Sequence, residues 1–265
     1  MTPAPTRLAA TILLVRDGPN GAEIGMVARN AKMDFAGGAL VFPGGSVDEG
    51  DRAARSVSDG VEGLSDEAAA LRAAAIREAF EECGVLLARR GGALVSGAEA
   101  ADLVASWRRR LEAREVGIAE MAAAEGLMLA SDLIAPFAHW ITPEAERKRF
   151  DTHFLIAEAP AGQALSYDGG EAVDAVWTTP EAAMAAARAG ERALMFPTWL
   201  NLQVLAGAEN AAEALAKAAA HPPVSVMPTL TRADAGFELR IPAEAGYGHA
   251  AYLVRGFAAE PEPIA

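Results

Sequence analysis

The chain contains 265 residues, a length that fits one large domain or two small ones. Apolar residues make up 52% of it and charged residues 22%, which excludes a wholly disordered chain and a collagen-like one. The formal net charge of −13 argues against non-specific binding to nucleic acid or to an anionic membrane, and the single cysteine excludes an internal disulfide.

The N-terminal part alternates strand signals with turn chemistry. Residues 8–16 and 22–29 read as strands and flank the turn-forming sequence 17–21, which predicts a β-hairpin. A short apolar run at 40–42 stops at a Pro-Gly-Gly sequence. The acidic, glycine-containing residues 48–63 that follow are expected to form a loop.

A helix is predicted next. Ser65 is a suitable N-cap, and Asp66 and Glu67 place carboxylates in the first turn, where they suit the helix dipole. The helix should run to about Cys83, with Gly84 as its C-cap.

The rest of the chain predicts helical regions separated by strands. Residues 98–130 are rich in Ala, Leu and Glu at helical spacing, which predicts two or three helices. Further elements follow in this order: a β-like tract from Trp140, a strand over 149–157, a turn at 168–170, a strand over 173–178, a helix from Pro180, a helix from Phe196 to about Ala220, and two or three short strands in the tail. We therefore divide the chain into a domain over 1–220, with a helical insert at about 92–135, and a C-terminal extension over 221–265 that packs on the domain or on a partner subunit.

The helix that ends near Cys83 carries a cluster of acids. At about 100° per residue, Glu78, Glu81 and Glu82 fall on one face, opposite an apolar face that contains Ile76 and Phe80. The three carboxylates repel one another, and a divalent cation such as Mg²⁺ or Mn²⁺ would remove that repulsion. A merely solvated acidic face is the alternative that the helix alone leaves open.

The glycine-rich segment upstream favours the metal interpretation. Together, Gly45, Asp51 and the sequence Arg77-Glu78-Ala79-Phe80-Glu81-Glu82-Cys83-Gly84-Val85 resemble the Nudix box. That motif has a glycine, an acid and then an Arg-Glu-x-x-Glu-Glu-x-Gly sequence. The sequence departs from it in the spacer, because residues 52–76 stand where the motif has seven residues, and Asp51 stands in place of a glutamate.

The resemblance implies a fold and a set of roles. It implies an α/β/α sandwich built on a mixed β-sheet, with Mg²⁺ or Mn²⁺ as the cofactor. Glu78, Glu81 and Glu82 would be metal ligands or base candidates, with Gly45 contributing backbone to the metal site. Arg77 would hold the loop against the helix, with Asp51 as its acidic partner. Many Nudix enzymes add an acid from outside the box, and Glu171, six residues before Trp177, is the candidate here. An ordinary loop glutamate is the alternative for Glu171.

A narrower resemblance concerns the substrate. The sequences 140–143 and 149–152, with the long spacer inside the box, look like the coenzyme A diphosphatase (motif 19-like) branch, over roughly residues 8–210. That branch implies hydrolysis of CoA or acyl-CoA to 3′,5′-ADP and (acyl-)phosphopantetheine. Arg29 and Arg149 are the candidate cations for the 3′-phosphate, and a solvated surface charge is the alternative for each.

The expected function is thus divalent-metal-dependent hydrolysis of a nucleoside diphosphate linked to another moiety. CoA-type substrates are the first candidates, and ADP-ribose or a nucleotide sugar is the alternative. A non-catalytic nucleotide sensor with the same fold is the alternative from another class. We expect a small-molecule nucleotide as partner, no nucleic acid and no membrane, cytoplasmic localisation, and a homodimer as one open alternative for the assembly.

Other signals are interpreted as structural. Cys83 lies on the apolar helix face and is expected to be a buried small hydrophobe. His139 and His153 lie in strand-like tracts, and we interpret them as packing or hydrogen-bonding groups, with a place for His153 in the substrate cleft as the alternative. The basic run 108–110 is interpreted as a solvated helix face.

Overall fold

A mixed β-sheet forms the centre of the computed structural model, which describes residues 4–30, 38–167, 169–170, 172–256 and 259–264. The main sheet is eight-stranded, with the order β10-β2-β1-β9-β8-β11, and β3 and β4 pair with β2 and β1. The pairs β1–β9 and β8–β11 are parallel and the others are antiparallel. The strands are β1 (Thr6–Gly18), β2 (Gly21–Arg29), β3 (Leu40–Val41), β4 (Gly44–Ser46), β8 (Ala135–Ile141), β9 (Arg149–Glu158), β10 (Ala172–Thr178) and β11 (Ser225–Val226).

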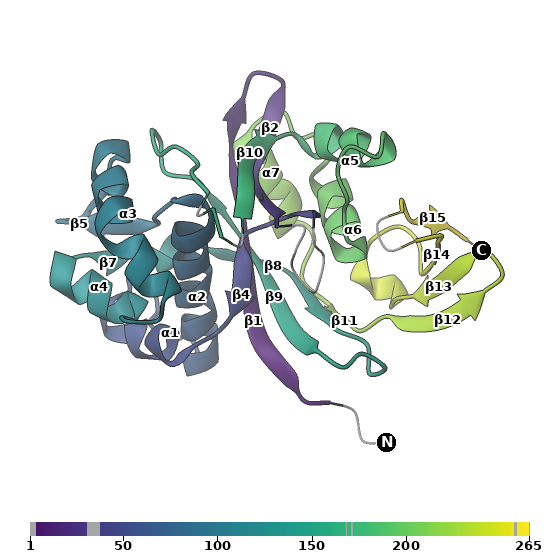
Figure 1. Cartoon of the computed structure of the whole chain (residues 1–265), viewed down its shortest axis with the longest axis horizontal. Helices are drawn as coiled ribbons and strands as arrows, with labels where there is room; N and C mark the ends of the chain where they lie inside the picture. The colour runs from purple at the N-terminus through teal and green to yellow at the C-terminus, as the bar shows by residue number, and fades with distance from the viewer. Residues whose placement is uncertain (1–3, 31–37, 168, 171, 257–258, 265) are drawn as a thin grey trace.

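Helices cover both faces of this sheet (Figure 1). The central strand β1 shows why, because its alternating residues enter two separate cores. Ile12 and Leu14 belong to the core that includes Phe80. Leu13 and Val15 belong to the core that includes Trp199. The expected α/β/α sandwich on a mixed sheet is therefore confirmed.

The acidic helix has the predicted ends. It is α2 (Asp66–Cys83), and the Ser65 hydroxyl accepts a hydrogen bond from the Ala68 amide. Gly84 closes the helix with φ 74°, a left-handed conformation that favours glycine. Alanines at 69, 70 and 73–75 are buried, so small side chains let α2 approach its neighbours closely.

The prediction of a loop over residues 48–63 is wrong in part. The structure has a short helix, α1 (Glu49–Ala53), followed by a 3₁₀ turn, η1 (Ala54–Val57). Asp48 and Asp51 form a capping box, in which each carboxylate accepts a hydrogen bond from the other residue's amide. Tertiary packing fixes the segment as well, because Ala54 and Val61 are buried. The stretch that we expected to be a loop is thus anchored at several points.

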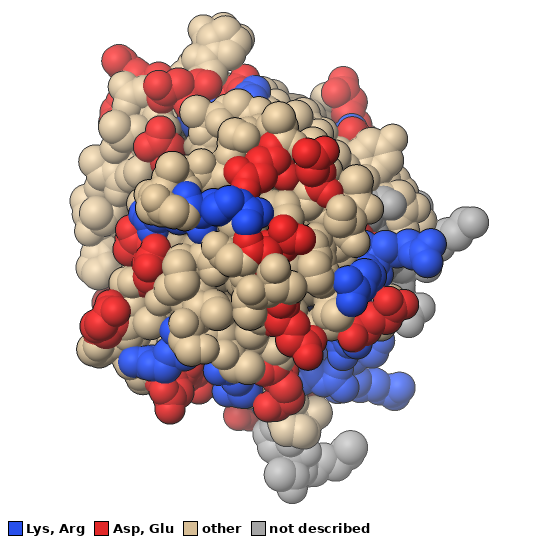
Figure 2. All heavy atoms as spheres, turned by 90° about the vertical axis from the view of Figure 1, so that its left-hand side faces the viewer, with Lys and Arg blue, Asp and Glu red and all other residues tan. Residues whose placement is uncertain are grey.

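The layer beyond α2 contains the remaining elements of the central third of the chain. They are α3 (Gly97–Glu112), α4 (Ile118–Glu125), the 3₁₀ turn η2 (Ser131–Leu133), and a small sheet with the order β6-β5-β7, in which β5 is Ala88–Arg90, β6 is Ala93–Leu94 and β7 is Met128–Leu129. Two or three helices were expected over residues 98–130, and the structure has two α-helices there, α3 and α4. Figure 2 shows the face on this side of the molecule, where acidic and basic side chains are interspersed. Among the described residues on that face, they form no continuous basic surface.

Two predicted boundaries differ in the structure, one of a helix in the opposite layer and one of a strand in the main sheet. It contains α5 (Pro180–Arg188), α6 (Phe196–Leu205) and α7 (Ala211–Ala219), where a single helix from Phe196 to about Ala220 was expected. Gly207, with φ 73°, breaks that helix, and Asn210 caps α7 through the amide of Glu213. The strand β8 begins at Ala135 and has Trp140 near its end, whereas the sequence placed Trp140 at its start.

The C-terminal residues form a separate four-stranded sheet with the order β12-β13-β14-β15. Its elements are β12 (Thr229–Ala233), β13 (Gly236–Arg240), the 3₁₀ turn η3 (Ala243–Ala245), β14 (Ala251–Val254) and β15 (Glu262–Pro263). Tyr252 is fully buried beside Phe196, with ring centroids 5.3 Å apart, and the Tyr247 hydroxyl donates to Asn201 Oδ1 at 2.8 Å. The extension therefore packs on α6. Within the described part of the chain, no helix combines the length and apolar character needed to cross a membrane.

Candidate active site

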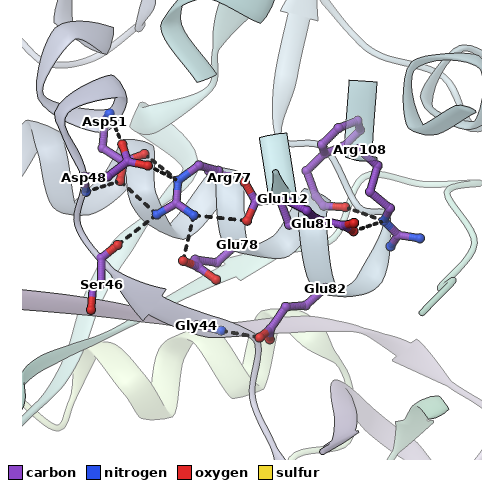
Figure 3. A network of polar contacts seen from close by, with 11 residues as sticks. Gly44, Ser46, Asp48, Asp51, Arg77, Glu78, Glu81, Glu82, Arg108 and Glu112 are labelled. Atoms are coloured by element: carbon purple, nitrogen blue, oxygen red, sulfur yellow. Dashed lines mark hydrogen bonds and ion pairs between the residues drawn. The ribbon is translucent and has the colours of Figure 1, made fainter. Parts of the chain in front are cut away.

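Arg77 of α2 is the centre of a buried polar network (Figure 3). Its Nε and Nη2 donate to the two carboxylate oxygens of Asp51, each at 2.9 Å, and Nη2 also donates to the Ser46 carbonyl at 3.0 Å. The side chain of Asp51 is fully buried and that of Arg77 is 7% exposed. The fold thus joins Asp51 to Arg77 across residues 52–76, as the motif resemblance implied.

The same guanidinium holds two of the acids of α2. Its Nη1 donates to Glu78 at 2.7 Å and to Glu81 at 3.2 Å. Burial opposes the charge of Arg77, but the hydrogen bonds of Asp51 and the charges of Glu78 and Asp51 outweigh it and raise the pKa of the guanidinium. Arg77 therefore stays charged and fixes the position of both glutamates.

Glu81 is an acid of α2 whose pKa is raised in the metal-free protein. Burial raises the pKa of its carboxyl to about 8, Arg77 offsets part of that effect, and the charge of Glu78 raises the pKa further. At neutral pH this carboxyl can carry a proton. A carboxyl with such a perturbed pKa is a candidate for acid–base chemistry.

The backbone of β4 lies directly against the acids of α2. The Gly44 amide donates to Glu82 Oε2 at 3.1 Å. A Cβ at Gly45 would collide with the Glu78 carboxylate, so only glycine allows this approach. Gly45 is thus explained by close contact with the Glu78 carboxylate, and Gly44 by the close approach of Thr11 on β1.

The chemistry of these donors fits a hard divalent cation. Glu78, Glu81 and Glu82 offer carboxylate oxygens within about one turn of helix, beside backbone amide and carbonyl groups of β4. Oxygen ligands are what Mg²⁺ and Mn²⁺ prefer. Asp51 is already occupied by Arg77, so its charge is balanced within the protein, and the charges of the α2 glutamates are the ones that a cation would balance.

Arg108 is a residue whose role the sequence interpretation missed. We interpreted the run 108–110 as a solvated helix face, but Arg108 is only 8% exposed. Its Nε donates to the Phe80 carbonyl in the last turn of α2 at 3.3 Å, and its Nη1 donates to the Ser166 hydroxyl at 3.2 Å. A signal was present, because the apolar residues Val104 and Leu111, at i−4 and i+3, place the buried face of α3 on the side of Arg108.

The remaining candidate residues have different settings. Glu171 lies outside the described residues. Arg29 is half-buried at the end of β2, and its Nε is buried without a hydrogen-bond partner among the described residues. Arg149 begins β9, and its guanidinium donates to the carbonyls of Thr142 at 3.1 Å and Ala4 at 2.9 Å. Cys83 is buried, as expected, and burial raises the pKa of its thiol to about 12.

Comparison with known proteins identifies the family. The profile of the NUDT19 Nudix domain matches residues 55–205. A NUDIX hydrolase from Alicyclobacillus acidocaldarius is 30% identical, with a TM-score of 0.64, over 80% of this chain and 96% of its own. A MutT NUDIX hydrolase from Burkholderia pseudomallei is 15% identical over 76% of this chain and 98% of its own, with a TM-score of 0.41. That weaker similarity says nothing further about this chain. The chain belongs to the NUDT19 Nudix domain family and is a Nudix hydrolase.

Proposed function

We propose that this Nudix hydrolase cleaves the diphosphate bond of a nucleoside diphosphate linked to another moiety, using a divalent metal ion. The observation that carries the proposal is the buried network around Arg77, which holds Glu78 and Glu81 in place beside the backbone of β4. A hydrolase of a diphosphate must offset the negative charge of its substrate. A set of fixed carboxylates can do so only with a cation between the acids and the phosphates.

The residues that would hold the ion are Glu78, Glu81 and Glu82, with the backbone at Gly45 beside them. Mg²⁺ or Mn²⁺, when bound, neutralises charge on the diphosphate and lowers the pKa of the attacking water. The donor set consists of oxygens, which supports these ions over softer ones.

The residues around the ion position the glutamates and accept a proton from the attacking water. Arg77 is a positioning residue, because its guanidinium contacts Asp51 and the glutamates and acts through them. The Gly44 amide orients Glu82. In this proposal Glu81 is the first candidate to accept the proton of the attacking water, because Arg77 fixes its carboxylate beside the other acids of α2. Glu171 stays the second candidate.

Coenzyme A or an acyl-CoA is the proposed substrate. The sequences 140–143 and 149–152 support this choice through their resemblance to the CoA diphosphatase branch. A CoA site needs a cation for the 3′-phosphate, and Arg29 suits that role because its Nε has no hydrogen-bond partner among the described residues. Arg149 is the weaker candidate, because backbone carbonyls already occupy its Nε and Nη1.

The alternatives differ in substrate or in class. ADP-ribose or a nucleotide sugar shares the diphosphate but lacks the 3′-phosphate of CoA. A non-catalytic sensor would bind the nucleotide without turnover, and the complete set of α2 acids with Arg77 counts against it. We also propose that residues 1–220 make up the catalytic domain and that 221–265 extend it, since the tail packs on α6 through Tyr252.

Product identification tests the proposal. The full chain is incubated with CoA, acetyl-CoA, dephospho-CoA, ADP-ribose and a nucleotide sugar, each with Mg²⁺, with Mn²⁺ and with EDTA, and products are identified by mass spectrometry. We expect 3′,5′-ADP and phosphopantetheine from CoA, with no turnover in EDTA. Charge-assisted contacts are worth about 1.5–3 kcal/mol, so dephospho-CoA should have a kcat/KM roughly 10- to 100-fold lower than CoA.

Variants assign the phosphate contact. Arg29→Ala should reduce the difference between CoA and dephospho-CoA, while Arg149→Ala should leave it unchanged. Equal kcat/KM values for the two substrates in the parent would reject CoA as the substrate, and better turnover of ADP-ribose than of either would favour the alternative substrate. Tight binding without turnover, with any cation, would favour the sensor.

A further inference from the structure

Two histidines and an aspartate meet on neighbouring strands, apart from the α2 acids. His139 lies on β8 and is the direct cross-strand partner of His153 on β9. Asp151 precedes His153 by two residues on β9, so both side chains lie on the same face of the sheet. Strands hold all three residues, and side chains on paired strands are positioned more rigidly than those on loops.

The potential ligand atoms of the three residues converge. His139 Nε2 lies 2.5 Å from Asp151 Oδ1, and His153 Nε2 lies 3.6 Å from the same oxygen. One atom from each residue can be chosen so that all three lie within 4.8 Å of one another. The two imidazole rings are stacked, with centroids 4.1 Å apart. Ligands of a tetrahedral Zn²⁺ at about 2.0–2.1 Å lie about 3.3 Å from one another, so small side-chain rotations would produce that arrangement.

A fourth residue orients one ring. Ser225 of β11 is paired with His139, and its hydroxyl lies 2.7 Å from His139 Nδ1. Histidines that bind metal usually donate their second ring N–H to such a partner, which fixes the ring and leaves the other nitrogen free to coordinate. The strand β11 therefore contributes an outer contact of the kind that supports metal ligands.

Exposure leaves the cluster accessible from solvent. The side chains of His139, Asp151 and His153 are 18%, 30% and 28% exposed. Burial lowers the pKa of His153, and the nearby His139 lowers it further, which favours the neutral ring that metals bind. An ion at this place would have three protein ligands and an open position for water or another small ligand.

We infer that His139, Asp151 and His153 form a second metal site, which binds Zn²⁺ or a similar late transition ion and differs from the carboxylate site of α2. Two imidazole nitrogens with one carboxylate oxygen suit Zn²⁺, whereas the all-oxygen set of α2 suits Mg²⁺ or Mn²⁺. The acid of α2 that influences His153 electrostatically is Glu67, in the first turn. Glu67 lies about 16 Å along the helix axis from Glu78, so the two sites lie at opposite ends of α2.

Metal titration of the full chain tests this inference independently of the proposed function. The protein is stripped with a chelator and titrated with Co²⁺, whose visible absorption reports tetrahedral nitrogen and oxygen ligands, and the bound Co²⁺ is then displaced by Zn²⁺. We expect one equivalent at the site, and no such absorption in His139→Gln or His153→Gln. Ser225→Ala should weaken Zn²⁺ binding about tenfold, because it removes the outer hydrogen bond.

Two controls separate this site from the active site. His249→Gln changes an exposed histidine outside the cluster and should bind like the parent. The double variant Glu78→Gln/Glu82→Gln should keep Co²⁺ binding even where diphosphate hydrolysis is lost. Circular dichroism checks that each variant folds. If a histidine variant does not fold, Zn²⁺-induced changes in the ring ¹⁵N shifts of the folded parent decide instead, since they identify the histidines that coordinate.

Three results of the titrations would overturn the inference: a parent that binds neither ion, binding that survives both His139→Gln and His153→Gln, or binding that disappears only with the glutamate double variant. Unchanged ring shifts of His139 and His153 in the presence of Zn²⁺ would overturn it as well.

Discussion

Asp51→Asn tests the buried pair that joins the two halves of the Nudix box. The substitution keeps the size of the side chain but removes its charge and one of its two hydrogen bonds to Arg77, each now 2.9 Å long. Breaking a buried ion pair by removing one partner costs about 3–5 kcal/mol, because the other charge stays buried. Arg77 keeps its contacts with Glu78 and Glu81, so we expect the lower end, about 3 kcal/mol.

Urea unfolding followed by far-UV circular dichroism, with EDTA present, measures the loss. With an m-value of about 3 kcal/mol/M, the midpoint should fall by about 1 M. The matched control is Glu262→Gln. Arg255 donates to Glu262 with the same two 2.9 Å distances, but these side chains are 52% and 51% exposed. Solvent screens such a pair, so the control should leave the midpoint unchanged.

An equal midpoint shift in the two variants would refute the reasoning, because the geometry of the pairs is the same and only their burial differs. A midpoint for Asp51→Asn within error of the parent would show that Arg77 does not depend on Asp51. In that case the chain between β4 and α2 would be held by its other contacts, such as the buried Ala54 and Val61.

Three further predictions concern α2. Glu82→Gln should lower kcat at least about 100-fold in steady-state assays while the circular dichroism spectrum stays unchanged, because it removes charge from a site that stabilises the transition state; near-normal turnover would reject its role. In metal-free protein, Glu81 holds its proton up to a pKa of about 8 when folded, so the free energy of unfolding should fall as pH rises from about 4.5 to 8, by up to about 4 kcal/mol. Glu81→Gln should remove that slope, and a slope that persists would contradict the assignment. Burial raises the pKa of Cys83 to about 12, so a thiol reagent at pH 8 should label it only as fast as the protein unfolds, and immediate labelling of the folded chain would refute its burial.

The sequence by itself determined the elements that follow from local rules. Ser65 and Gly84 bound α2 because a hydroxyl N-cap and a left-handed glycine are local requirements, and the structure has both. The helical period placed Glu78, Glu81 and Glu82 on one face, and the motif resemblance gave the family. The sequence also predicted the antiparallel pairing of the opening hairpin, since turn-forming residues lie between two apolar runs.

Only the tertiary structure decided which distant groups meet. The pairing of Arg77 with Asp51, the burial of Arg108 against the end of α2, and the meeting of His139 with Asp151 and His153 all depend on how strands and helices pack. The sequence alone does not show how close two residues that are far apart in the chain lie in space, because the chain between them can fold in many ways. Burial, which raises the pKa of Glu81 and makes the pair at Arg77 costly to break, is likewise a property of the packed molecule and not of the residues alone.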